Sequence, residues 1–201
     1  MEFGACLKSF IYLISASLFY PVLLLLSSGA LWIVLSAGAV FAEWLERVRL
    51  PRIAAEKLPA IIATGPDPAT LPHRVRTYIQ RLTAVIEEKK HTEPAIEILI
   101  QDTTLSFWKS TDRLRMAVRI APSLGLIGTL IPMGTGLAAL GQGDMTRLSS
   151  DLVIAFTTTV VGLAVGITAF FLHTVKLRWI EEDIRNIELA TDILIGEAGE
   201  P

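Results

Sequence analysis

The chain has 201 residues, of which 52% are apolar and only 19% are charged. A soluble globular domain carries roughly 25% charged residues, so this chain is poor in charge. Its net charge of −2 provides no basic surplus for nucleic acid, and its single cysteine, Cys6, cannot form a disulfide within the chain. The composition therefore excludes a disulfide scaffold and a disordered chain, and it predicts no nucleic-acid partner.

Three long stretches contain no Asp, Glu, Lys or Arg: residues 9–42, 120–143 and 152–175. A helix of about 20 apolar residues crosses the hydrocarbon core of a membrane, so each stretch is long enough to span it. The sequence therefore predicts an all-α integral membrane protein with three transmembrane helices and a cytoplasmic helical bundle. This pattern excludes an ordinary soluble enzyme.

Basic residues indicate the orientation, because Lys and Arg near the ends of spans stay in the cytoplasm. Most of the 18 Lys and Arg residues lie between the first two apolar stretches, and Arg47 and Arg49 directly follow the first. Outside the spans, only Lys8 and Arg147 lie on the opposite side. We therefore expect a multi-pass protein of the cytoplasmic membrane, with its N-terminus outside and its C-terminus in the cytoplasm.

The first apolar stretch is longer than one span requires. At 1.5 Å per residue, residues 9–42 would extend to about 50 Å, against a hydrocarbon core of ~30 Å. Pro21 offers a break, so we expect an outer, partly interfacial helix over 1–20 and a transmembrane helix over 21–43. The alternative is a signal peptide cleaved near Ala30, which would leave too few residues to span.

The cytoplasmic residues are predicted to be helical. Proline and glycine are concentrated in 63–72, which indicates a linker. Apolar residues at helical spacing then predict an amphipathic helix over 72–90, which either packs on neighbouring helices or lies on the membrane. Another helix is expected to begin near Pro94.

In chain order, the expected segments are the outer helix 1–20, transmembrane helix 21–43, cytoplasmic domain 44–119, transmembrane helix 120–142, outer loop 143–150, transmembrane helix 151–175 and cytoplasmic tail 176–201.

The third span is predicted to continue into the tail as one helix over 151–195, because no Gly or Pro interrupts it before Gly196. Its apolar stripe is expected to face the bundle, while Glu181, Asp183 and Glu188 face away. The cytoplasmic parts contain no phosphate-binding loop, metal-ligand cluster or nucleophile motif. We therefore expect no cofactor, no metal and no enzymatic activity.

Small residues recur every three or four positions along the second and third spans, which places them on one face of each helix. In a membrane, such faces let helices approach closely. The predicted packing positions are Gly125, Gly128, Pro132, Gly136, Gly162 and Gly166.

Threonines share these faces, namely Thr129 in the second span and Thr158 and Thr159 in the third. A buried hydroxyl can bond back to its own helix, but it also suits a narrow polar path without fixed charge. No Asp, Glu, Lys or Arg lies within a span, and Asp151 at the outer edge is the candidate entrance acid. A proton relay normally holds an intramembrane carboxylate, so either this protein moves no ions or another chain supplies that group.

Residues 120–130, IAPSLGLIGTL, resemble the second-span signature of the MotA/TolQ/ExbB proton-channel family, and they are closest to the ExbB and TolQ branch. Residues 152–166 resemble the third span of the family. The resemblance implies a pentamer of this chain around a dimeric, single-span partner of the ExbD, TolR or MotB type, which supplies the essential aspartate. The sequence departs from the pattern at Ile154, where the ExbB and TolQ branch has a glutamate.

The resemblance thus implies a channel or stator subunit of a proton- or sodium-driven membrane motor. Ions would pass the partner's aspartate along a path lined by Thr129, Thr158 and Thr159. The alternative is a non-conducting membrane scaffold or receptor subunit that assembles through the same small-residue faces.

Overall fold

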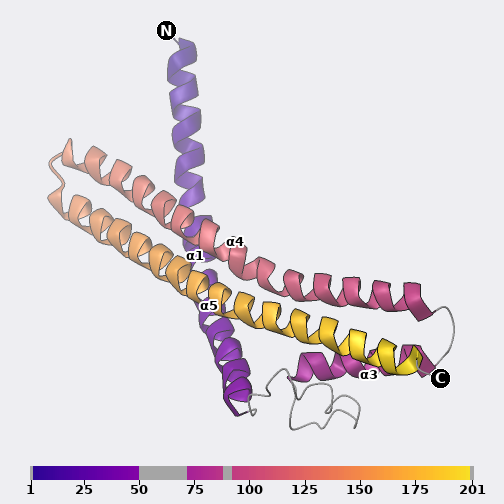
Figure 1. Ribbon diagram of the computed structural model, residues 1–201. Helices are drawn as coiled ribbons and strands as arrows, with labels where there is room; N and C mark the ends of the chain where they lie inside the picture. The colour runs from indigo at the N-terminus through magenta and orange to yellow at the C-terminus, as the bar shows by residue number, and fades with distance from the viewer. Residues whose placement is uncertain (1, 50–71, 88–91, 200–201) are drawn as a thin grey trace. The chain divides into compact units, whose positions relative to one another are not determined.

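The computed structural model describes residues 2–49, 72–87 and 92–199 (Figure 1). Within these ranges the regular elements are all helices, namely α1 (Glu2–Arg49), α3 (His73–Glu87), α4 (Thr92–Leu140) and α5 (Met145–Gly199). Three of them, α1, α4 and α5, are long and apolar enough to cross a membrane. The predicted all-α fold with three spans is therefore confirmed.

The helices pack as two compact units, and each long helix contributes to both. The first, here called the span unit, comprises Met1–Ala37 and Leu114–His173. The second, the bundle unit, comprises Gly38–Arg113 and Thr174–Pro201. In the span unit, the second half of α4 runs antiparallel to the first half of α5 (Figure 1).

Helix α1 continues through Pro21, so the predicted break at that residue is wrong. A proline removes one N–H and therefore one helical hydrogen bond. Apolar membrane helices tolerate this loss, because small local adjustments and neighbouring groups satisfy the freed carbonyl. The division into an interfacial part (1–20) and a spanning part (21–43) stays a prediction.

The turn between α4 and α5 is shorter than the predicted loop over 143–150, since α5 already begins at Met145. Gly143 has a φ of +78°, a left-handed conformation that glycine adopts without strain. The Asp144 carboxylate then accepts a hydrogen bond from the backbone N–H of Arg147 at 3.0 Å, which caps the new helix. The predicted start of this helix is residue 151, after the last charged residues of the loop. That start is too late, because a charged residue such as Asp144 can also cap the first turn of a helix.

The core of the bundle unit is built by α3 together with parts of α4 and α5. The predicted stripe of α3 is buried against these neighbours, so the packing interpretation of this helix is confirmed. The buried apolar cluster consists of Val75, Tyr78, Ile79, Leu82, Ile96, Phe107, Ile180, Ile187 and Ala190. As predicted, α4 begins near Pro94 and α5 runs unbroken past residue 195. The predicted linker up to residue 71 and the end of the helix beyond Glu87 lie outside the described residues.

Candidate functional site: hydroxyls in the seam between α4 and α5

The small-residue faces of α4 and α5 meet in the span unit, along a contact that we call the seam. A Cβ atom placed on Gly162 would lie 2.7 Å from the Cα of Gly125 and 2.8 Å from the carbonyl oxygen of Ala121. Real Cβ contacts are essentially never this short. The two backbones therefore touch here, and Gly162 has no room for a side chain.

The other predicted glycines lie along the same seam. A Cβ on Gly166 would lie 2.7 Å from Pro122 Cγ, and one on Gly128 would lie 2.9 Å from Thr158 Cβ. Gly136 faces Leu148 and Asp151, with corresponding distances of 3.2 and 3.3 Å. Pro132 is buried as well.

The structure brings the three predicted threonines together around one carbonyl. The hydroxyls of Thr129 and Thr159 are in hydrogen-bonding contact with each other. Those of Thr129, Thr158 and Thr159 also lie 3.4, 2.8 and 3.3 Å from the carbonyl oxygen of Ala155. Thr129 has a further acceptor in the carbonyl of Gly125 at 2.9 Å.

A threonine hydroxyl has one proton to donate, so Thr129 and Thr159 cannot make all of these bonds at once. Each has two or more arrangements of its hydroxyl within the same side-chain geometry. A group of neutral oxygens with interchangeable hydrogen bonds can pass or coordinate a small cation without carrying charge itself. We refer to Thr129, Thr158, Thr159 and the Ala155 carbonyl as the hydroxyl cluster.

The members of the hydroxyl cluster differ in exposure. Thr158 is buried against Gly128, whereas Thr129 and Thr159 are half-buried at the margin of the seam. Thr157 is exposed and donates to the carbonyl of Val153 at 2.7 Å. The half-buried pair is therefore the part of the cluster that another molecule can reach.

Asp151 lies in the same seam but outside the hydroxyl cluster. Its carboxylate accepts a hydrogen bond from the Thr135 hydroxyl at 2.7 Å. At 1.5 Å per residue, Thr135 stands about 9 Å from Thr129 along α4. The structure therefore does not bring Asp151 into contact with the threonine pair. Sequence reasoning noted Thr135 among the hydroxyls of the second span but did not pair it with Asp151, because that pairing depends on the register between α4 and α5.

On the Gly125 side of the hydroxyl cluster, the seam is tightly packed at two glycine contacts. The contacts there join Gly125 to Gly162 and Pro122 to Gly166. A contact that cannot admit a methyl group cannot admit a water molecule. Any ion that reaches the cluster must therefore continue outside this seam.

A buried charge network lies in the bundle unit and contradicts one expectation. Asp183, predicted to face away, is fully buried and pairs with Arg47 at 2.5 Å. Glu43 lies 3.7 Å from Arg47 and 3.3 Å from Arg74, and the Arg47 guanidinium lies 5.2 Å from the centroid of the Trp179 ring. Burial raises the pKa of Asp183, and the hydrogen bond and charge of Arg47 oppose that shift. The sequence showed the helical period of α5 but not which neighbour would meet this face.

Two comparisons with known proteins give matches. Residues 69–189, more than half of the chain, match the model of the MotA/TolQ/ExbB proton channel family. A putative biopolymer transport protein ExbB homolog from Methanothermobacter thermautotrophicus is 31% identical over 102 residues, which cover 50% of this chain and 37% of that protein. The matched region thus spans little more than a third of the relative. No solved structure matches the chain.

Proposed function

Because the chain belongs to the MotA/TolQ/ExbB proton channel family, a family of membrane channels and not of enzymes, we propose that it is the channel or stator subunit of an ion-driven motor. The driving ion is a proton or a sodium ion. The observation that supports this role most directly is the contact between the Thr129 and Thr159 hydroxyls in a seam that is otherwise backbone-tight. Neutral hydroxyls are conspicuous there, because the neighbouring positions are filled by glycine and alanine.

Because the seam is closed at its glycine contacts, we expect another chain to form the second wall of the ion path. Gly125 and Gly162 leave no water passage within the subunit, while Thr129 and Thr159 are reachable at the seam margin. A homo-oligomer would arrange these pairs around a central partner. The family resemblance implies that this oligomer is a pentamer. That partner would be a single-span protein of the ExbD, TolR or MotB type with an intramembrane aspartate.

The partner's aspartate would couple ion movement to motion. A charge at the centre of a membrane costs roughly 2.5–3.5 kcal/mol on insertion scales. Protonation or ion binding removes that cost, so the charged and neutral forms prefer different positions beside the hydroxyl pairs. Each ion that binds or leaves would then shift the population between discrete arrangements of pentamer and partner. These shifts would turn the pentamer relative to the partner.

Asp151 would serve the outer entrance. In the proposed orientation, with the N-terminus outside and the C-terminus in the cytoplasm, the turn between α4 and α5 is external. Thr135 holds the Asp151 carboxylate near that turn. Thr135 and Thr129 are separated by about 9 Å along α4, so Asp151 would act at the entrance and not within the hydroxyl cluster.

The decisive experiment replaces the two accessible hydroxyls. Thr129→Val/Thr159→Val keeps the side-chain shape and removes both oxygens. Thr157→Val is the matched control, since that hydroxyl lies in the same triplet but is exposed and bonded only to its own helix. The complex with the single-span partner is reconstituted into liposomes, and proton and sodium fluxes are measured at equal protein content and equal oligomeric state.

We expect the double variant to assemble with its partner and to lose most of its flux, while the Thr157 variant conducts like the wild type. Wild-type flux through the double variant would refute the hydroxyl path. A stable wild-type complex that conducts neither ion would favour the alternative of a non-conducting scaffold or receptor subunit.

A further inference from the structure

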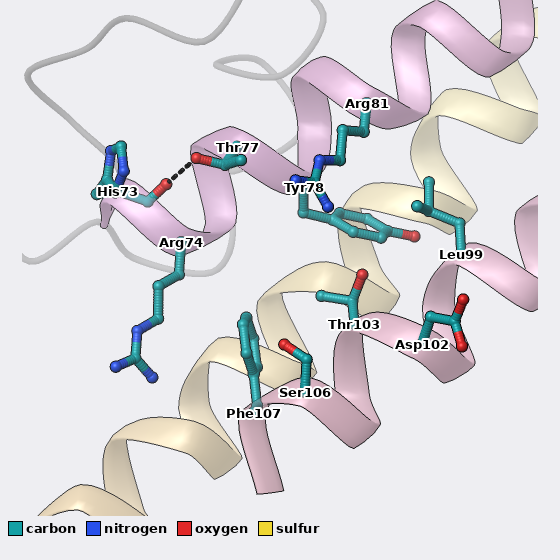
Figure 2. Close-up of a pocket in the computed structure, with 10 residues that line it drawn as sticks. All are labelled: His73, Arg74, Thr77, Tyr78, Arg81, Leu99, Asp102, Thr103, Ser106 and Phe107. Atoms are coloured by element: carbon teal, nitrogen blue, oxygen red, sulfur yellow. Dashed lines mark hydrogen bonds between the residues drawn. The ribbon is translucent and has the colours of Figure 1, made fainter. Parts of the chain in front are cut away.

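The bundle unit contains a cavity of 380 Å³ between α3 and α4 (Figure 2). Its size falls in the range of small-ligand pockets, roughly 300–1,000 Å³. Helix α3 contributes basic side chains and α4 contributes hydroxyls. The polar residues that matter here are His73, Arg74, Arg81, Asp102, Thr103 and Ser106.

Two arginines line this pocket. They are Arg74 and Arg81, and Asp102 is the acid that lines it with them. Within the part of the chain that the structure describes, Arg81 and Asp102 form no ion pair. Figure 2 shows Arg81 lying back along α3 toward Tyr78, beside the space between the two helices. Arg81 is exposed, so an anion in the pocket can reach its guanidinium group.

Arg74 adds an unsatisfied donor at the other end of the pocket. One of its terminal nitrogens, Nη2, lies 3.3 Å from Glu43, and its guanidinium lies 5.6 Å from the centroid of the Phe107 ring. The other terminal nitrogen, Nη1, is buried and has no hydrogen-bond partner in the described structure. A buried donor without an acceptor is unfavourable, so an oxygen ligand that reaches this guanidinium would be stabilised.

The local backbone adds to this positive field. Helix α3 begins at His73, and its first turn contains no acidic residue. The residue before it, Pro72, has no side-chain oxygen that could cap that turn. The positive end of the helix dipole therefore adds to the positive field of Arg74.

We propose that the pocket between α3 and α4 binds the phosphate group of an anionic phosphate ester. Arg81 and Arg74 would contact the phosphate oxygens, and the hydroxyls of Thr103 and Ser106 would donate to the same group. Guanidinium groups and hydroxyls together match the several acceptor oxygens of a phosphate. This proposal concerns the bundle unit and does not depend on the ion path.

Two sources could supply such a group, a phospholipid headgroup or a soluble phosphate ester. Arg74 pairs with Glu43, the last residue of the first predicted transmembrane helix, so this end of the pocket would adjoin the membrane surface. Arg81 lies about 10 Å further along α3, away from this contact with Glu43. The test must therefore offer both kinds of ligand.

The experiment uses the full chain in mild detergent and native mass spectrometry. The probes are phosphatidylglycerol, diacylglycerol, which lacks the phosphate, and glycerol phosphate, which lacks the lipid chains. Arg81→Gln removes a pocket cation whose side chain is exposed. Arg185→Gln removes the same charge from an exposed position on α5 outside the pocket. Ser106→Leu fills the pocket without changing its charge, and Ser106 is also exposed.

We expect phosphatidylglycerol or glycerol phosphate to bind the wild type and Arg185→Gln equally, and to bind Arg81→Gln and Ser106→Leu about tenfold more weakly. Binding of phosphatidylglycerol that glycerol phosphate does not displace identifies a lipid headgroup. Binding of glycerol phosphate by itself identifies a soluble ester. Equal affinity of all variants, equal binding of diacylglycerol, or no binding of any probe would overturn the proposal. If Ser106→Leu does not fold, the Arg81 and Arg185 pair still decides the question.

Discussion

The span unit and the bundle unit contain parts of the same helices, α4 and α5, and pack them by different means. In the span unit, Gly125 and Gly162 bring two backbones into contact. In the bundle unit, large side chains such as Tyr78, Leu82 and Ile187 fill the space between helices. In lipid, apolar burial provides little drive for helix association, so close backbone packing must supply it. In water, burial of large apolar groups is itself favourable.

The two units also treat polar groups differently. The span unit holds neutral hydroxyls in its seam, whereas the bundle unit buries the Arg47–Asp183 ion pair. A functional path through a membrane benefits from oxygens that bear no charge, because fixed charge in the hydrocarbon core is costly. In the bundle unit, the hydrogen bond and the charge of Arg47 offset part of the cost of burying Asp183. The neutral threonine pair and the buried ion pair thus lie in separate units of the chain.

The largest effect is expected when the ion pair of the bundle unit is broken. Arg47→Met leaves Asp183 buried without its partner, which should lower the free energy of unfolding by about 3–5 kcal/mol. The double variant Arg47→Met/Asp183→Leu should recover most of this loss, because no charge is left buried. Unfolding in mixed micelles, followed by the fluorescence of the four tryptophans, measures both. If the single and double variants are equally unstable, the pair does not act as a unit.

A bulky residue in the seam should disrupt the close backbone packing of the span unit. Gly162→Leu places a side chain where a single Cβ would already lie 2.7 Å from a backbone atom, and overpacking of this kind costs about 1–3 kcal/mol or more. Gly134→Leu is the control on α4, since no atom lies within 4 Å of its Cβ position. Thermal unfolding and native mass spectrometry should show a defect for Gly162→Leu alone. Equal behaviour of both variants would argue against a backbone-tight seam.

A single hydrogen bond in the bundle unit should matter less. Tyr78→Phe removes the 2.7 Å contact between the Tyr78 and Thr191 hydroxyls. Thr191 keeps its bond to the carbonyl of Ile187 at 2.8 Å, so no polar group is left stranded. We expect a loss of about 1 kcal/mol in the free energy of unfolding, with ion flux unchanged. A loss comparable to that of Arg47→Met would mean that the tyrosine supports more than one contact.

The smallest effect is a pH dependence confined to the bundle unit. The pKa of Asp183 is raised above its ordinary value of 3.8, chiefly by burial, so the folded state holds its proton more tightly than the unfolded state. Its contribution to stability is therefore full below pH 3.8 and declines as pH rises through the raised pKa. Loss of Arg47 should raise this pKa further, so the deficit of Arg47→Met should shrink on acidification. Unfolding measured across the acidic range checks this, with Asp183→Asn as the variant that lacks the slope.

What the sequence determined by itself was local to each helix. The lengths of the charge-free stretches indicated three spans, and the steps of three and four residues placed Gly125, Thr129, Thr159 and Gly162 on inner faces. These features are periodic along one chain segment and need no knowledge of neighbours. The threonine part of the candidate site could be selected for the same reason.

The tertiary structure decided which faces meet and in which register. It paired Thr135 with Asp151, buried Asp183 against Arg47, and formed the pocket beside Arg81. It also carried α1 through Pro21, where the local rule predicts a break. The physical reason is the same in each case. The free energy of a charge, a hydroxyl or a proline depends on the groups that surround it, and those come from segments distant in the sequence.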